Sequence, residues 1–196
     1  MLPGLSCRDL VAVLIKYKER GAERRLVVCS AYLPYDSEDP PPSEELEELV
    51  RHCENENLCL VVGCDSIAQH SAWGSTNCNS RGKALMEYLN SSNLEILNRG
   101  SEPTFCSGSS LGWRITLGTL RLLQSITDWQ VSSEPSLSDH RHILFTLRDS
   151  VPVRLIRNRR GTKWGSFKGD LQDRLERGPE MNVKHEAGLG LIIWIQ

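Results

Sequence analysis

A short apolar run that gives way abruptly to polar residues constrains this chain most. Residues 58–74 read LCLVVGCDSIAQHSAWG, and the first part has the length and β-branched character of a buried strand. The run stops at Gly63, and Asp65 and His70 follow within a few positions. A rigid strand that delivers a carboxylate and an imidazole into a loop is a common support for chemistry. From these residues alone a plainer interpretation stays open, a core strand followed by a polar surface loop.

The composition fits one folded domain followed by a basic segment. The chain has 196 residues, of which 39% are hydrophobic and 24% are charged, as is usual for a soluble globular domain. We expect the folded domain over residues 1–150 and a linker or tail over residues 151–196, where basic residues and glycines accumulate. The basic residues are Arg154, Arg157, Arg159, Arg160, Lys163 and Lys168.

Charge and cysteine usage narrow the class of protein. The net charge of −2 gives no overall attraction to nucleic acid, so DNA binding needs a local basic patch or a metal ion. The seven cysteines form no CxxC pair, which disfavours structural zinc and favours a reduced, intracellular protein. No apolar run reaches the roughly 18 residues of a membrane span, and no signal peptide precedes the first strand-like run. The chain begins almost directly on that run, as a fragment does.

Hydrophobic patterning predicts intermixed strands and helices. Residues 10–17 and 25–32 predict an antiparallel hairpin, and Ser43 before a run of glutamates predicts a helix N-terminus. A second helix is expected over residues 80–91, and residues 170–196 suggest a short helix with a frayed end. Further strands are expected over residues 94–97, 114–117, 125–131 and 141–147. Because the antiparallel pairs have no helix between them, an α/β sandwich with mixed sheets fits better than a doubly wound parallel sheet.

A second polar stretch, Ser138-Asp139-His140, precedes the last strand-like run. Neighbours on an extended chain point in opposite directions, so these three residues cannot form a catalytic triad among themselves. Groups from other strands would have to complete a site. The alternative is a turn capped by Ser138 and Asp139, with His140 on the surface.

Four stretches together resemble a known family. VVGCDSIAQHSAWG, PTFCS, RITLG and SLSDHRHILF, in this order and at this spacing, are similar to the endonuclease domain of non-LTR retrotransposons. That domain is part of the endonuclease/exonuclease/phosphatase family, whose relatives include DNase I-like and apurinic-site nucleases. The resemblance covers residues 10–147. It implies a four-layer α/β sandwich with two packed sheets, of which this chain would lack the first strands.

The resemblance also implies an activity. Members of the family cleave the phosphodiester bonds of DNA with a divalent metal, Mg²⁺ or Mn²⁺, and an intact relative carries a downstream reverse transcriptase domain. The expected partner is therefore DNA, and the expected location of a functional copy is the nucleus. Such chemistry needs a base that activates water, a cation for the phosphate charge and donors that hold the reacting centre in line.

Residue by residue, the resemblance assigns roles to the two polar stretches. His140 matches the general base, and Asp139 matches the adjacent carboxylate on the metal side. Asp65 matches the carboxylate that positions the attacking water or protonates the leaving group, and Tyr32 matches a tyrosine near the scissile phosphate. The residues that match the substrate-binding part of the family pattern are His70, Trp73 and Ser138.

This chain also departs from the family pattern. Ile67 stands where the family has an asparagine, so an amide donor is replaced by an alkyl group. Arg114 stands where the family has the aspartate that holds the catalytic histidine, which inverts the charge beside His140 and disfavours its imidazolium form. Gln69 occupies a position where histidine is frequent. No candidate for the family's metal-binding glutamate precedes Leu10.

Three functional hypotheses remain. The first is an active Mg²⁺-dependent endonuclease that relies on Asp65, Asp139 and His140. The second, which we favour, is a family member by fold with little catalysis, because losing one oriented donor costs ~10²–10³ in rate and losing the orienting aspartate ~10⁴. The third is a non-catalytic nucleic-acid-binding module that uses the basic residues of 154–168. A solvated linker toward a reverse transcriptase is the simpler interpretation of that segment.

Overall fold

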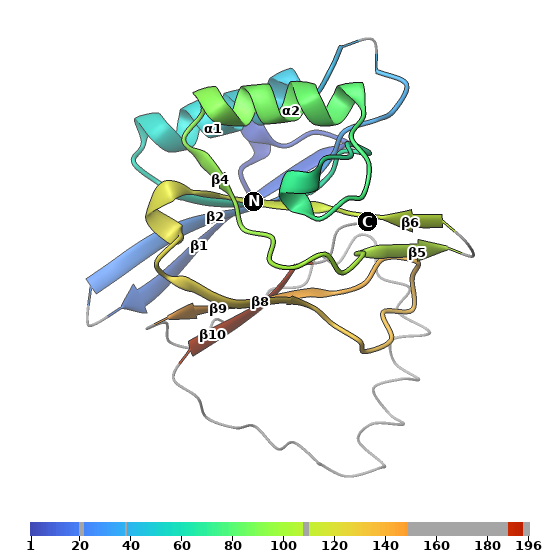
Figure 1. Cartoon of the computed structure of the whole chain (residues 1–196). Coiled ribbons are helices and arrows are strands. Elements are labelled where there is room, and N and C mark those ends of the chain that lie inside the picture. Colours follow the sequence, from blue (N-terminus) through green and yellow to red (C-terminus); the bar gives the residue numbers. More distant parts are fainter. Residues whose placement is uncertain (20–21, 38, 108–109, 149–187, 194–196) are drawn as a thin grey trace, which may run out of the picture.

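Three layers of an α/β sandwich are visible in Figure 1: a pair of helices, a five-stranded sheet and a three-stranded sheet. The computed structural model describes residues 1–19, 22–37, 39–107, 110–148 and 188–193. Helices cover one face of the larger sheet, and the smaller sheet lies against the other face (Figure 1). The expected class, a mixed α/β sandwich with two packed sheets, is confirmed. The expected count of four layers is not met in the described residues, because no helix layer covers the outer face of the smaller sheet there.

The larger sheet has the strand order β1-β2-β3-β7-β4. Its strands are β1 (Leu10–Glu19), β2 (Ala22–Tyr32), β3 (Cys59–Asp65), β4 (Leu94–Ile96) and β7 (Ile115–Thr119). The first two strands form the expected antiparallel hairpin. Strand β2 then runs parallel to β3, and β7 is antiparallel to β3 and to β4. The buried strand β3 thus lies at the centre of the sheet, as its continuous apolar run predicts.

Both helices begin at a side-chain cap and bury an apolar side against the larger sheet. Helix α1 spans Glu44–Asn55, and Ser43 Oγ accepts a hydrogen bond from the Leu46 amide at 3.4 Å. Helix α2 spans Ser80–Ser91 and begins after Asn79. Their buried residues join one apolar cluster with β2 and β3. Within the described residues, neither helix has the length and apolar character needed to cross a membrane.

The smaller sheet has the order β10-β9-β8 and packs on the other face of the larger one. Its strands are β8 (Ile126–Val131), β9 (Ile143–Arg148) and β10 (Gly188–Ile193). Strand β10 falls within residues 170–196, where a short helix was expected. The run GLGLII is apolar, and as a strand it pairs antiparallel with β9 along all six of its residues. This pairing is a long-range contact that a local pattern does not reveal.

A short hairpin completes the fold beside the two sheets. It consists of β5 (Phe105–Ser107) and β6 (Ser110–Gly112). The division into residues 1–150 and 151–196 stays a prediction, although β10 shows that part of the second segment belongs to a sheet of the fold. The basic residues between 154 and 168 lie outside the described residues.

Candidate functional site

Three side chains from neighbouring strands lie at one edge of the larger sheet. Tyr32 ends β2, Asp65 ends β3, and the two residues are partners in the parallel register. Arg114 immediately precedes β7, whose first residue, Ile115, pairs with Cys64. Arg114 therefore lies opposite Asp65, because an antiparallel register advances by one residue on each strand.

Asp65 and Arg114 form a buried ion pair. Arg114 Nη2 lies 2.7 Å from Asp65 Oδ2, and the two side chains are only 11% and 6% exposed, respectively. Little water reaches the pair, so its attraction is weakly screened. Burial raises the pKa of Asp65, whereas the charges of Arg114 and His140 oppose this rise. Asp65 thus has a cationic partner supplied by the chain itself.

Backbone pairing through Thr104 brings His140 to the same edge. An isolated antiparallel bridge joins Phe105 to His140, and the Arg141 amide donates to the Thr104 carbonyl at 2.8 Å. The Thr104 hydroxyl oxygen accepts a hydrogen bond from the Arg114 amide at 2.6 Å. One residue therefore ties the segment that carries His140 to the segment that carries Arg114.

Phe105 contacts both of these side chains. Its ring centroid lies 5.0 Å from that of His140, in an edge-to-face arrangement, and 5.0 Å from Cζ of Arg114. Arg114 Nε and His140 Nδ1 are buried and have no hydrogen-bond partner in the described part of the chain. Since a hydrogen bond at one ring nitrogen sets which nitrogen carries the proton, the tautomer of His140 is not fixed from Nδ1.

The electrostatics at His140 follow from its neighbours. Burial lowers the pKa of His140, and the Arg114 charge lowers it further. Asp65 and Asp139 act in the opposite direction but do not reverse the shift. The neutral imidazole of His140 is therefore favoured near pH 7, and Arg114 acts in the direction expected from its charge.

The remaining residues of the Ser-Asp-His stretch lie on the surface. Ser138 and Asp139 are exposed, and Ser138 Oγ accepts a hydrogen bond from the His140 amide at 3.2 Å. No group of three or more His, Cys, Asp or Glu side chains is placed to hold a metal ion among the described residues. Arg114 occupies Oδ2 of Asp65, which leaves Oδ1 as a buried oxygen without a hydrogen-bond partner among the described residues. The other carboxylate of the site, Asp139, is exposed, whereas Mg²⁺ requires several oxygen ligands in one place. The described side chains do not fit the divalent metal that the resemblance implies.

The loop after β3 buries Trp73 and leaves His70 half-buried. Trp73 is 1% exposed, and its Nε1 donates to the Ala68 carbonyl at 3.1 Å. His70 is half-buried, accepts the Ala72 amide at Nδ1 and lies 5.2 Å from the Trp73 ring. The buried position of Trp73 and its hydrogen bond to the Ala68 carbonyl indicate that this side chain stabilises the loop. Contact between these two residues and a substrate stays a prediction.

Ile67 adopts an unusual backbone conformation in the same loop. Its φ of 48° lies in the left-handed region, which asparagine and glycine tolerate and a β-branched residue does not. Asn79 holds this part of the loop: its Nδ2 donates to the Ile67 carbonyl at 3.2 Å, and its Oδ1 accepts the amides of Gln69 and Gly82. The loop is therefore tied to the first turn of α2.

Sequence reasoning missed several residues that build the site. Asn79 stands one residue before the expected second helix, where asparagine is a preferred cap, and this signal could have found it. Arg81, also at the start of α2, is buried and donates to the Ser66 and Leu33 carbonyls. No local pattern identifies Arg81 or Phe105, because their contacts depend on segments that are distant in the sequence.

Comparisons with known proteins agree with this fold. A family model described as endonuclease-reverse transcriptase matches residues 26–144, more than half of the chain. The endonuclease domain of TRAS1, a telomere-specific non-LTR retrotransposon, is similar in structure, with a TM-score of 0.59 and 29% identity over 74% of this chain and 66% of that one. The catalytic domain of Xenopus laevis APE2 shares the fold, with a TM-score of 0.50 and 14% identity over 68% of this chain and 53% of that one. None of the curated proteins matches significantly.

The mixed sandwich and these structural likenesses define a DNase I-like fold. The chain spans just under two thirds of the TRAS1 domain and about half of the APE2 domain. Within this fold class, the chain belongs to the endonuclease-reverse transcriptase family. The expected relationship to retrotransposon endonucleases is confirmed.

Proposed function

We propose that this chain is a retrotransposon-type endonuclease domain that engages the phosphodiester backbone of DNA but hydrolyses it no faster than the background. The observation that carries the proposal is the 2.7 Å ion pair between Arg114 and Asp65. It occupies the sheet edge where β2 and β3 end and where His140 also lies. Of the residues to which we assign hydrolysis, Tyr32, Asp65 and His140 lie at this edge, and the carboxylate of Asp65 is paired with a cation.

His140 is the residue best suited to accept a proton from water. Its lowered pKa keeps the imidazole neutral at physiological pH, which a general base requires. However, no described residue bonds its Nδ1 atom. In a comparable system the loss of the group that orients the histidine costs ~10⁴ in rate.

Arg114 weakens the expected role of Asp65, which is to position the attacking water or to protonate the leaving group. The guanidinium at 2.7 Å from Oδ2 compensates the charge of the Asp65 carboxylate, and only Oδ1 is left without a hydrogen-bond partner among the described residues. Asp65 is therefore less able to orient a water molecule or to protonate a leaving group. Ile67 provides no side-chain donor to a phosphate oxygen, and one such donor is worth ~10²–10³. Such losses are not additive, but each acts in the same direction.

The proposal includes the partners of an intact relative. DNA is the substrate, a reverse transcriptase domain is the neighbour in the polypeptide, and the nucleus is the place of action. Mg²⁺ or Mn²⁺ is the cofactor implied by the family resemblance, and the described residues do not supply its ligands. We therefore assign no step of hydrolysis to a metal ion.

Restoring the family residues tests the proposal. We expect the variant Ile67→Asn/Arg114→Asp to nick supercoiled plasmid at least ~10² times faster than the unmodified chain, with Mg²⁺ or Mn²⁺ present. Arg141→Asp is the matched control, because it makes the same exchange at a more exposed arginine that pairs with Glu102. An equally slow restored variant that is folded would show that Arg114 and Ile67 do not limit the reaction.

A further inference from the structure

Arg81 is a buried cation that is bonded by backbone carbonyls. It is the second residue of α2 and is 9% exposed. Its Nε donates to the Ser66 carbonyl at 3.2 Å, and its Nη2 donates to the Leu33 carbonyl at 3.0 Å. Burying a guanidinium against neutral partners is costly compared with leaving it in water. A specific role is therefore expected for this side chain.

The two carbonyls that Arg81 binds flank the candidate site. Leu33 follows Tyr32 in the sequence, and Ser66 follows Asp65. The Leu33 amide donates to the Asp65 carbonyl at 2.8 Å. The guanidinium thus closes a ring of hydrogen bonds across the ends of β2 and β3, at the point where the ladder between the two strands ends.

We propose that Arg81 is a positioning residue of the candidate site, which fixes the ends of β2 and β3 and so keeps Tyr32 and Asp65 in place. This inference rests on the proposed function of that site. An arginine suits the task because its planar fork presents N–H groups in fixed directions to two acceptors. A lysine offers a single compact ammonium on a flexible stem and does not reproduce that geometry.

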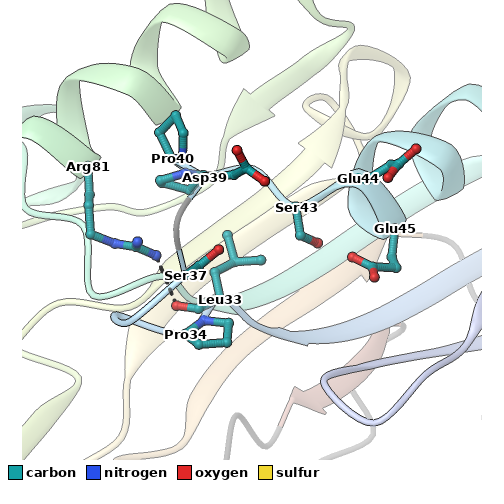
Figure 2. A pocket seen from close by; sticks show the side chains of 10 residues that line it. Leu33, Pro34, Ser37, Asp39, Pro40, Ser43, Glu44, Glu45 and Arg81 are labelled. Carbon is teal, nitrogen blue, oxygen red and sulfur yellow. Dashed lines mark hydrogen bonds between the residues drawn. The ribbon is translucent and has the colours of Figure 1, made fainter.

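A cavity gives solvent access to this side chain. The cavity has a volume of about 230 Å³ and is lined by Arg81, by residues between β2 and α1, and by the first two residues of α1. Figure 2 shows the Arg81 side chain reaching down to the Leu33 carbonyl, with Asp39, Glu44 and Glu45 around the same cavity. These carboxylates favour the entry of a small cation. Free guanidinium therefore has a route to the Leu33 carbonyl when the Arg81 side chain is removed.

Amide hydrogen exchange in Arg81→Ala tests the proposal. We expect the Leu33 amide to lose at least ~10-fold in protection relative to the amide of Val62, which is buried in β3 and reports on global unfolding. Guanidinium chloride, far below denaturing concentrations, should restore Leu33 protection, whereas urea at the same concentration should not. Arg51→Ala, at an exposed position of α1, is the control and should leave the ratio unchanged.

Two results would overturn the proposal. One is an equal loss of protection at Leu33 and Val62, which indicates a general stabilising role. The other is a failure of guanidinium to restore Leu33 in a folded variant. If Arg81→Ala does not fold, Arg81→Lys carries the same comparison of amides and should show the same selective loss. The measurement uses no DNA, so its outcome is independent of whether the domain is a nuclease.

Discussion

At the scale of the residue, Ile67 and Arg114 set the character of the site. Arg114 compensates the charge of Asp65, and Ile67 holds a backbone conformation that suits asparagine. The sequence resemblance located both positions as departures from the family pattern. It did not predict the ion pair, because that contact depends on the pairing of β7 with β3 rather than on either segment alone.

Replacing Ile67 by asparagine should stabilise the protein. A non-glycine residue in the left-handed region costs on the order of 1–3 kcal/mol, and asparagine carries less of that cost. We expect Ile67→Asn to raise the free energy of unfolding by about 1 kcal/mol, measured by urea denaturation. Ile67→Val is the control, because it keeps the β-branch and should bring no gain. An Ile67→Asn variant less stable than Ile67→Val would contradict the argument.

Removing one partner of the Asp65–Arg114 pair should lower the stability of the protein more, per residue changed, than removing both partners. Either Asp65→Asn or Arg114→Gln alone leaves a buried charge without its partner, and we expect a loss of about 3 kcal/mol from each. The double variant should lose clearly less than the sum of the two. A double-mutant cycle of urea denaturation measures this coupling, and simple additivity would show that the two charges do not interact.

His140 should make stability fall as the solution becomes acidic. Its pKa in the folded chain is lowered from the usual 6.5. As pH falls below that value the unfolded chain binds the proton first, so stability is lost until the folded pKa is passed. Between about pH 7.5 and about pH 5.5 the unmodified chain should therefore lose more stability than His140→Gln. Equal losses would mean that His140 titrates alike in both states.

At the scale of the element, the start of α2 organises the loop that follows β3. Asn79 and Arg81 both bond that loop, from positions two residues apart. Gly82 is packed so closely that a Cβ atom there would overlap the Gln69 carbonyl. The helix and the loop can approach each other only because this residue has no side chain.

Gly82→Ala should destabilise the protein although alanine favours helices. The gain in helix propensity is about 1 kcal/mol, and separating α2 from the loop should cost more than that, for a net loss of about 2 kcal/mol in thermal or urea unfolding. Gly4→Ala is the matched control, since a Cβ there meets nothing within 4 Å. If Gly82→Ala were as stable as Gly4→Ala, the loop would not depend on this close contact.

Elements with a strong local signal were predicted well. The hairpin of β1 and β2 follows from two β-rich runs, α1 from its cap at Ser43, and α2 from its apolar spacing. Strand β10 was not predicted, because its identity depends on β9 as a partner. The same holds for the bridge from Phe105 to His140, which joins segments more than thirty residues apart.

At the scale of the whole molecule, the fold explains why the site residues come together. Strands β2 and β3 run parallel, so both end at one edge of the larger sheet. The segment before β9 reaches that edge through its bridge to β5. The family match, from residue 26 to residue 144, covers β3, β5, the segment before β9 and the last seven residues of β2. The fold is thus shared with the family, whereas the positive charge beside Asp65 comes from Arg114 of this chain.

Plasmid nicking by the unmodified chain tests the central claim most directly. The assay compares the chain with His140→Ala on supercoiled DNA, with Mg²⁺ or Mn²⁺ and with a chelator. Because Arg114 is paired with Asp65 and His140 lacks an orienting partner at Nδ1, we predict that both proteins nick at the same background rate. Nicking that needs both the metal ion and His140 would contradict the account and would show that other groups supply the missing functions.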